Sequence, residues 1–369
     1  MVAITLVLRY HSGMPKPQKS ATPTDPLIAR DPINRRARRS SGGITLSDVA
    51  KVAGVSAITA SRALNTPAVV SPDTLKKVLD AVGRTGYVPN MLAGGLASSR
   101  SRLVAALVPT IAGPVFLETI QALTEALAES GYQLMLGQSG YTGHREDALL
   151  DAIIGRRPDG IVLTGIMHSA EGRRRLLAAG IPVVETWDLT PTPMDMLVGF
   201  SHEKVGAAVA EYLHAKGRRR LAIVTADDHR ASLRRNAFDA AAARLGLRDV
   251  AACVVPAPTT LGSGRFGLSA LLKNHREIDA VFCSSDVLAM GVITEAHARG
   301  LSVPDDFSVF GFGDLGFAGD THPALTTVRV DGTAIGRQAA KFIIERAEGR
   351  SVAQRVVDLG FSIVERQSA

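Results

Sequence analysis

The stretch Ile44-Thr-Leu-Ser-Asp-Val-Ala-Lys-Val-Ala-Gly-Val-Ser-Ala-Ile-Thr-Ala-Ser-Arg-Ala-Leu-Asn65 predicts two short helices joined by a glycine turn. Its first helix begins at the capping-box-like Thr45-Leu-Ser-Asp48, after which apolar residues recur at helical spacing. The second helix is expected at about residues 56–64. Ser71-Pro72-Asp73 then supplies an N-cap, a proline and an acid for a third helix that ends near Gly86. This order of helices predicts a helix-turn-helix.

In a helix-turn-helix the second helix lies in the major groove of DNA. Arg62 is suited to the edge of a guanine, whereas Ala57 and Ile58 offer apolar contact, for example to a thymine methyl group. An ordinary three-helix core with a surface arginine explains the same spacing. The helix pattern alone therefore leaves both interpretations open.

The charge of the chain is unevenly distributed. Residues 1–102 hold 15 lysines and arginines against 5 acidic residues, whereas residues 103–369 hold 27 against 30. A basic front indicates a polyanionic partner, either nucleic acid or an anionic membrane. Residues 1–43, with five prolines and the run Arg35-Arg-Ala-Arg-Arg39, are expected to form a disordered extension. Whether that run steers the protein to phosphates or is a solvated tail stays open.

Length and composition exclude several classes of protein. The 369 residues are enough for two or three domains, and 46% hydrophobic residues exclude a disordered chain. Two cysteines are too few for a disulfide framework, so we expect a cytoplasmic protein. The chain has no uninterrupted run of 18 apolar residues and no recognisable secretion signal, which argues against a membrane or exported protein. The nine histidines lack partners at metal-binding spacing, so we expect neither a metal nor a cofactor.

From Leu103 onward, short apolar runs alternate with helical patterns. This alternation predicts parallel sheets with helices on both faces. Two sets of strands predict two α/β lobes with a ligand cleft between them. The first set is expected at residues 103–108, 133–136, 160–163 and 181–184, and the second at residues 196–199, 221–225, 280–283 and 308–311.

One motif favours an enzyme. Gly311-Phe-Gly-Asp-Leu-Gly316 follows an expected strand and has the glycine spacing of the dinucleotide-binding loop of an NAD-dependent oxidoreductase. Its context argues against that function, because Pro323 and the extended-looking residues 325–330 follow where a phosphate-capping helix should begin. We therefore expect a protein that is not an enzyme.

Four stretches resemble the DNA-binding headpiece and hinge of the lac repressor (LacI/GalR) family in both order and spacing. They are Ile44-Thr-Leu-Ser-Asp-Val-Ala-Lys-Val-Ala-Gly-Val-Ser56, Thr59-Ala-Ser-Arg-Ala-Leu-Asn65, Val70-Ser-Pro72 and Gly86-Tyr-Val-Pro-Asn90. The rest of the chain resembles the periplasmic-binding-protein-like core of that family, for example at Ser285-Asp-Val-Leu-Ala-Met-Gly291. The resemblance implies an all-α helix-turn-helix headpiece followed by a two-lobe α/β core.

The resemblance also implies a division of the chain. After the extension at residues 1–43, it implies a DNA-binding domain at 44–89, a hinge helix at 90–101 and a core for effector binding and dimerisation at 102–369. In the family the hinge lies in the minor groove, where the leucine matching Leu96 wedges into a base step. Because Gly94-Gly95 disfavours a helix, we hypothesise that the hinge orders only on its operator. The predicted DNA-binding residues are Thr45, Leu46, Ser56, Ala57, Ile58, Thr59, Ser61, Arg62, Asn65, Tyr87, Asn90, Ala93 and Leu96.

For the core, the resemblance implies a small metabolite held between the lobes. It places Arg234 and Asp286 at effector-contacting positions, and an arginine with an aspartate suits a ligand that has an acid and several hydroxyls. Packing or capping roles stay open as alternatives: Asp286 could cap the helix that follows it, and the neighbouring Arg235 shows that one arginine of the pair lies on the surface. The predicted effector-binding residues are Val115, Phe116, Trp187, Asp188, Arg234 and Asp286.

Finer resemblance indicates the gluconate-type repressors, through Pro182-Val-Val-Glu-Thr-Trp-Asp188 and Arg235-Asn-Ala-Phe238. It implies a repressor that binds a pseudo-palindromic operator as a homodimer and is released by gluconate or a related sugar acid. The few residues after Val364 leave no room for the leucine heptads of a tetrameric branch. A solute-binding protein of the same two-lobe fold is the alternative, although it would need an export signal and would not need residues 44–90.

Overall fold

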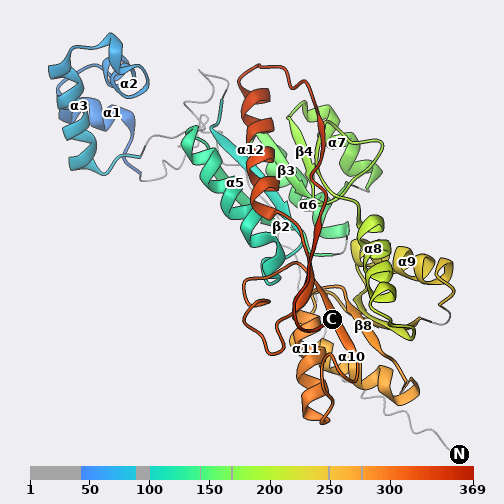
Figure 1. Cartoon of the computed structure of the whole chain (residues 1–369). Helices are drawn as coiled ribbons and strands as arrows, with labels where there is room; N and C mark the ends of the chain where they lie inside the picture. The colour runs from blue at the N-terminus through green and yellow to red at the C-terminus, as the bar shows by residue number, and fades with distance from the viewer. Residues whose placement is uncertain (1–42, 89–99, 142, 168, 248–249, 276) are drawn as a thin grey trace, which may run out of the picture. The chain divides into compact units, whose positions relative to one another are not determined.

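The computed structural model describes residues 43–88, 100–141, 143–167, 169–247, 250–275 and 277–369 (Figure 1). The chain divides into two compact units, Met1–Pro89 and Asn90–Ala369. The first is helical and the second is an α/β unit built on two sheets.

The helices of the first unit begin and end at the residues that cap them. The backbone N–H and the hydroxyl of Thr45 both donate to Asp48 Oδ2 before the first helix, and Ser56 Oγ accepts from the N–H of Thr59 before the second. Between these helices Gly54 has a φ of 68°, the left-handed conformation that closes the turn. The predicted helix-turn-helix is confirmed, with α1 at Leu46–Ala53, α2 at Ala57–Asn65, a 3₁₀ turn η1 at Pro67–Val69 and α3 at Pro72–Thr85.

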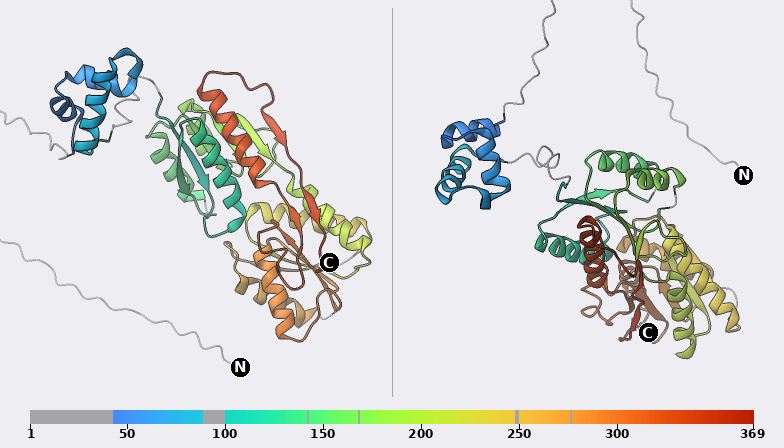
Figure 2. Two further views of the ribbon diagram at one scale, coloured as in Figure 1. Left: turned by 60° about the vertical axis from the view of Figure 1, so that its left-hand side comes forward. Right: turned by 90° about the horizontal axis from the view of Figure 1, so that it is seen from above.

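The first lobe of the second unit is a six-stranded parallel sheet in the order β11-β5-β4-β3-β1-β2. Alternate residues of β1 face opposite layers: Val104 and Ala106 lie in the core cluster with α5 and α12, and Ala105 and Leu107 in the cluster with α6 and α7. Both views of Figure 2 show α12 (red) beside α5. The strands are β1 at Leu103–Val108, β2 at Gln133–Gln138, β3 at Gly160–Thr164, β4 at Val183–Thr186, β5 at Met196–Gly199 and β11 at Val356–Asp358. The helices are η2 at Pro114–Phe116, α5 at Leu117–Glu129, α6 at Gly143–Ile154, α7 at Ala170–Ala179 and α12 at Gly332–Ala347.

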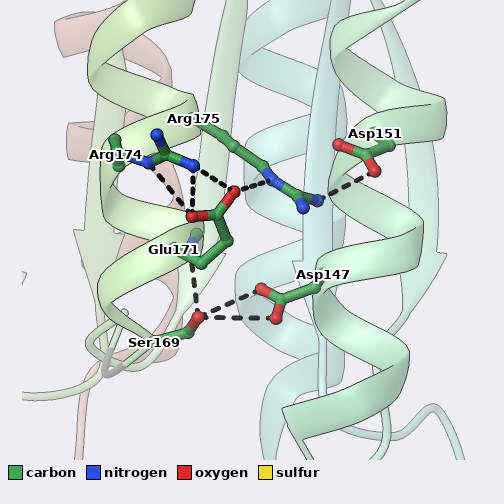
Figure 3. A network of polar contacts seen from close by, with 7 residues as sticks. Asp147, Asp151, Ser169, Glu171, Arg174 and Arg175 are labelled. Carbon is green, nitrogen blue, oxygen red and sulfur yellow. Dashed lines mark hydrogen bonds and ion pairs between the residues drawn. The ribbon is translucent and has the colours of Figure 1, made fainter.

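A network of polar contacts joins α6 to α7 on the surface of this lobe (Figure 3). Glu171 forms ion pairs with Arg174 and Arg175, and Arg175 Nη1 lies 2.8 Å from Asp151 Oδ2 on α6. Ser169 Oγ, which caps α7, donates to Asp147 Oδ1 of α6 at 3.2 Å. These contacts join α6 and α7, the two helices that cover the face of the first sheet on which Ala105 and Leu107 lie.

The second lobe is a six-stranded sheet in the order β12-β10-β9-β8-β6-β7, in which only β12 is antiparallel to its neighbour. Helices α8 and α9 pack against each other on one face, and α10 and α11 on the other. The strands are β6 at Leu221–Ala226, β7 at Ala251–Val255, β8 at Ala280–Cys283, β9 at Ser308–Phe312, β10 at Thr326–Arg329 and β12 at Ser362–Val364. The helices are α8 at His202–Ala215, α9 at His229–Arg244, α10 at Leu261–Asn274 and α11 at Asp286–Ala298.

The two expected lobes are confirmed, but one strand was assigned to the wrong lobe. We expected residues 196–199 to open the second set, whereas β5 pairs with β4 in the first sheet. The chain crosses between the lobes three times, after β5, after β10 and after β11. Strand order along the chain therefore does not reveal which sheet a strand joins.

The glycine motif at residues 311–316 forms the end of β9 and a loop that leads to β10, with no helix between them. A Cβ atom at Gly311 would clash with Asp286 Oδ1, so this glycine makes room for a buried carboxylate. The structure thus gives the motif a packing role, and a phosphate-binding loop does not form.

Candidate ligand cavity and nucleic-acid interface

A cavity of about 90 Å³ lies between the two lobes of the second unit, at the carboxyl ends of their strands. This is the edge at which open α/β sheets bind ligands. Aromatic side chains, two arginines and hydroxyl groups surround it. Its lining includes Val115, Phe116, Tyr141 and Trp187 from the first lobe, and His202, Asp228, Arg230, Arg234, Thr259, Ser284, Ser285 and Phe312 from the second.

Trp187 forms one wall of the cavity, and its side chain is held by a ring contact and a hydrogen bond. Its ring meets the ring of Phe116 edge-on, with centroids 5.2 Å apart, and its Nε1–H donates to Thr119 Oγ1 at 3.0 Å. The Thr119 hydroxyl in turn donates to the carbonyl of Gly332. Trp187 has a φ of 65°, a left-handed conformation that is uncommon for a bulky residue and that clusters at functional sites. The two predicted aromatic residues therefore do lie together on the cavity.

Arg234 lies at the base of the cavity and is only 5% exposed. Its Nη1 donates to His202 Nδ1 at 2.9 Å and its Nη2 donates to the carbonyl of Ser284 at 3.2 Å. Because Arg234 is always a donor, His202 Nδ1 must be the acceptor, which leaves the proton on His202 Nε2. That Nε2–H donates to the carbonyl of Trp187 at 2.9 Å. A chain of hydrogen bonds therefore runs from Arg234 in the second lobe to Trp187 in the first.

The charge of Arg234 has no ion-pair partner, although the more distant carboxylates of Asp228 and Asp188 act to raise its pKa. Among the residues that the structure describes, no carboxylate lies within ion-pair distance of its guanidinium, and its Nε is buried without a hydrogen-bond partner. Burial lowers the pKa of Arg234 to about 10 and holds the pKa of His202 well below its usual value. Instead of an anion, the aromatic face of Phe312 covers the guanidinium, with its centroid 4.0 Å from Cζ.

Asp286 and Asp188 lie beside the cavity and do not line it. Asp286 is fully buried, where its Oδ1 accepts from the Thr327 hydroxyl at 2.6 Å and its Oδ2 from the N–H of Leu315 at 2.7 Å. The cap of α11 is Ser285, whose hydroxyl accepts from the N–H of Leu288. Burial raises the pKa of Asp286 to about 6 and raises the pKa of Asp188 as well.

Sequence reasoning missed Arg230 and His202. Arg230 lies one helical turn before Arg234 on α9 and also lines the cavity. This i, i+4 spacing was available in the sequence as a signal. Nothing in the sequence around His202 indicated its role, because both of its partners come from distant segments.

In the first unit, the side chains of α2 that were predicted to face bases are exposed. Ile58 is 67% exposed, and Ser56, Ala57, Arg62 and Asn65 are exposed as well. An apolar side chain so exposed on a small helical unit is suited to contact with a partner. Thr45 is exposed at the start of α1, whereas Leu46, Thr59, Ser61 and Tyr87 are partly buried, and Leu46 and Tyr87 pack against the core. Asn90, Ala93 and Leu96 lie outside the described residues.

The residues that the structure describes contain no group of three or more histidine, cysteine, aspartate or glutamate side chains placed to hold a metal ion. None of their helices combines the length and the apolar character needed to cross a bilayer.

Comparison with known proteins finds one family along the chain. Residues 45–90 match the bacterial regulatory proteins of the lacI family, and residues 210–369 match a periplasmic binding protein-like domain. The HTH-type transcriptional regulator GntR of Pseudomonas aeruginosa is 38% identical over 337 residues, which cover 91% of this chain and 98% of the relative. The crystal structure of a LacI-family regulator from Silicibacter pomeroyi superposes with a TM-score of 0.84 at 31% identity, covering 88% of this chain and 99% of the other. The lac repressor dimer bound to operator is similar in fold, with a TM-score of 0.77 at 23% identity over 88% of this chain and 99% of that one.

Proposed function

The chain belongs to the lacI family of bacterial regulatory proteins, and we propose that it represses transcription under the control of a small sugar acid, gluconate or a related one. It is a DNA-binding regulator and not an enzyme. In this proposal residues 44–89 read the operator in the cytoplasm, residues 90–101 form the hinge, and residues 102–369 bind the effector and dimerise.

The observation that carries the choice of an acid is that the guanidinium of Arg234 is buried without an ion-pair partner. A buried charge without a partner costs several kcal/mol. Arg234 is buried, has an orphaned Nε and has no carboxylate partner in the described chain. A carboxylate ligand supplies the missing counter-ion, and the hydroxyls of Thr259, Ser284 and Ser285 around the cavity suit the hydroxyls of a sugar.

Effector control follows from the position of the cavity. A ligand held by both lobes favours the arrangement in which both contact it, and it shifts the equilibrium by its difference in affinity for the two arrangements. We propose that binding of the ligand favours the state in which the repressor has released its operator. The ligand and the operator then oppose each other, and the coupling between the two sites is reciprocal.

Calorimetry with the full chain tests the ligand. We expect gluconate or phosphogluconate to bind, and neutral hexoses to bind far more weakly. Binding of a neutral sugar or a nucleobase alone would overturn the proposal. A mobility-shift titration tests the sign of the effect, since gluconate should release the operator, and tighter binding to DNA would reverse the assignment.

We also propose that a second copy of the chain covers an apolar groove of about 460 Å³ on the second lobe. Its lining includes Leu261 and Phe317, which are 41% and 37% exposed, together with Val287 and Met290 of α11. A dimer suits the function because one helix-turn-helix reads only half of a palindromic site. Analytical ultracentrifugation should find a dimer that Phe317→Glu weakens, and a wild-type monomer at micromolar concentration would contradict this assignment.

A further inference from the structure

Arg230 reaches across the cavity from one lobe to the other. It lies in the first turn of α9 in the second lobe, and both of its contacts are in the first lobe. Its Nη1 donates to the carbonyl of Thr164, the last residue of β3, at 3.3 Å. Its Cζ lies 5.1 Å from the centroid of the Phe116 ring, which is a cation–π contact. The guanidinium therefore spans the space in which a ligand would lie.

The contacts of Arg230 are weak and easily exchanged. A hydrogen bond of 3.3 Å to a neutral carbonyl is longer than the charge-assisted bonds that a guanidinium forms with a carboxylate. No carboxylate in the described chain lies within ion-pair distance of Arg230. Its side chain is also only partly buried, so it can turn toward a ligand without opening the core.

Arg234 differs in each of these respects. Two of its nitrogens are already bound, to His202 and to the carbonyl of Ser284, and its ring partner Phe312 fixes its plane. The charge of Arg230 contributes to lowering the pKa of Arg234 and of His202, while the charges of Asp228 and Asp188 act on Arg234 in the opposite direction. Two guanidiniums at one small cavity repel each other, and a ligand anion held between them lowers that repulsion.

We propose that Arg230 is the residue that selects an acid, by exchanging the carbonyl of Thr164 for the carboxylate of the ligand and holding it together with Arg234. This inference rests on the proposed function and adds the residue on which discrimination against neutral sugars depends. The forked geometry of the guanidinium fits a carboxylate with two parallel hydrogen bonds, which a hydroxymethyl group cannot accept.

The test compares two probes that differ at one carbon, gluconate and its neutral counterpart glucitol, by calorimetry on the full chain. For Arg230→Gln we expect the affinity for gluconate to fall about 10- to 100-fold, as for loss of a hydrogen-bonded charge, while any affinity for glucitol changes less than about twofold. Arg230→Lys keeps the charge but lacks the forked guanidinium, so its affinity for gluconate should lie between those of wild type and Arg230→Gln. The advantage of Arg230→Lys over Arg230→Gln should decline as the salt concentration rises.

Arg235→Gln is the matched control, because Arg235 is the neighbouring arginine of α9 and pairs with Asp239 away from the cavity. It should leave the affinities for both probes unchanged, and all three variants should keep the wild-type melting temperature within a few degrees. The inference alone is overturned if wild type binds gluconate and Arg230→Gln binds it within twofold of wild type. It is overturned too if Arg230→Lys and Arg230→Gln lose affinity equally. A wild-type protein that binds a neutral sugar and no sugar acid overturns the proposed function as well.

Discussion

His202 gives a prediction that needs no ligand. Its imidazole accepts from Arg234 at Nδ1 and donates to Trp187 at Nε2, so a second proton has no place and would face the Arg234 charge. Burial, together with the charge of Arg234, therefore holds the pKa of His202 well below 6.5, the value of a free histidine. Acidification should destabilise the fold, because His202 binds a proton in the unfolded chain and stays neutral in the folded chain.

The size of the effect follows from linkage. A histidine that stays neutral when folded and has a pKa of 6.5 when unfolded costs about 0.1 kcal/mol of stability at pH 7.5 and about 1.4 kcal/mol at pH 5.5. The stability is fully present above pH 6.5 and is lost as pH falls below it. Asp286 acts in the opposite direction, since its pKa of about 6 lies above the usual 3.8 and its protonation in this range stabilises the fold. Wild type alone cannot separate the two groups.

The measurement is urea unfolding of wild type and His202→Gln at several pH values from 5.5 to 7.5. At pH 7.5 we expect the variant to be less stable by about 1–3 kcal/mol, because a flexible amide replaces the ring that accepts from Arg234 Nη1 and donates to the Trp187 carbonyl at fixed geometry. The difference in free energy of unfolding between the two proteins should narrow by about 1.3 kcal/mol at pH 5.5, because protonation of His202 stabilises only the unfolded state of wild type. His297→Gln, which removes an exposed histidine from α11, should follow wild type. A gap that stays constant with pH would refute the chain of hydrogen bonds through His202.

Four other substitutions test separate parts of the structure. Thr119→Val removes the acceptor of the Trp187 Nε1–H, so it should lower the free energy of unfolding by about 1–3 kcal/mol. It should also shift the fluorescence emission of Trp187, the single tryptophan of the chain, and unchanged stability and emission would contradict that contact. Arg62→Ala should weaken operator binding by about 1–3 kcal/mol and relax one base position in a mobility-shift assay, whereas an equal loss on random DNA would make Arg62 a phosphate contact. Gly206→Ala places a Cβ atom against the carbonyl of Arg234 and should destabilise the core by about 1–3 kcal/mol in thermal unfolding. The control Gly83→Ala has open space around it in α3 and should stabilise the helical unit by about 0.5–1 kcal/mol. Arg175→Ala breaks the ion pair to Asp151 that joins α7 to α6 and the ion pair to Glu171 within α7 (Figure 3). It should lower the free energy of unfolding by about 1 kcal/mol or less, and high salt should abolish even that difference.

The parts of the fold that local chemistry determines could be predicted from the sequence. The helices of the first unit were predictable because Thr45, Ser56 and Ser71 cap their own helices within three residues. Pairing between distant segments could not be predicted in the same way. Strand β5 was assigned to the wrong sheet because its partner is decided by a chain crossing that leaves no local signal.

The same distinction applies to the candidate site. Arg234, Trp187 and Phe116 were predicted from motif and resemblance, and the structure brings them to one cavity. His202 was set aside because it lacked metal-binding neighbours, yet its partners lie 15 and 32 residues away. The carboxylate of Asp286 is occupied by Thr327 and Leu315, so any ligand contact by it requires those hydrogen bonds to exchange.

The arrangement of the two arginines explains why an acid, and not merely a ligand of suitable size, would act on the relation of the lobes. A ligand that fills only the aromatic wall contacts Trp187 and Phe116, which both belong to the first lobe, so it binds almost equally well whatever the second lobe does. Such a ligand has nearly the same affinity for two arrangements of the lobes, so it does not shift the equilibrium between them. A carboxylate engages Arg230 and Arg234, which both belong to α9 in the second lobe. A sugar acid whose remaining atoms lie on Trp187 and Phe116 therefore contacts both lobes at once, and a difference in affinity between two arrangements of the lobes arises from that.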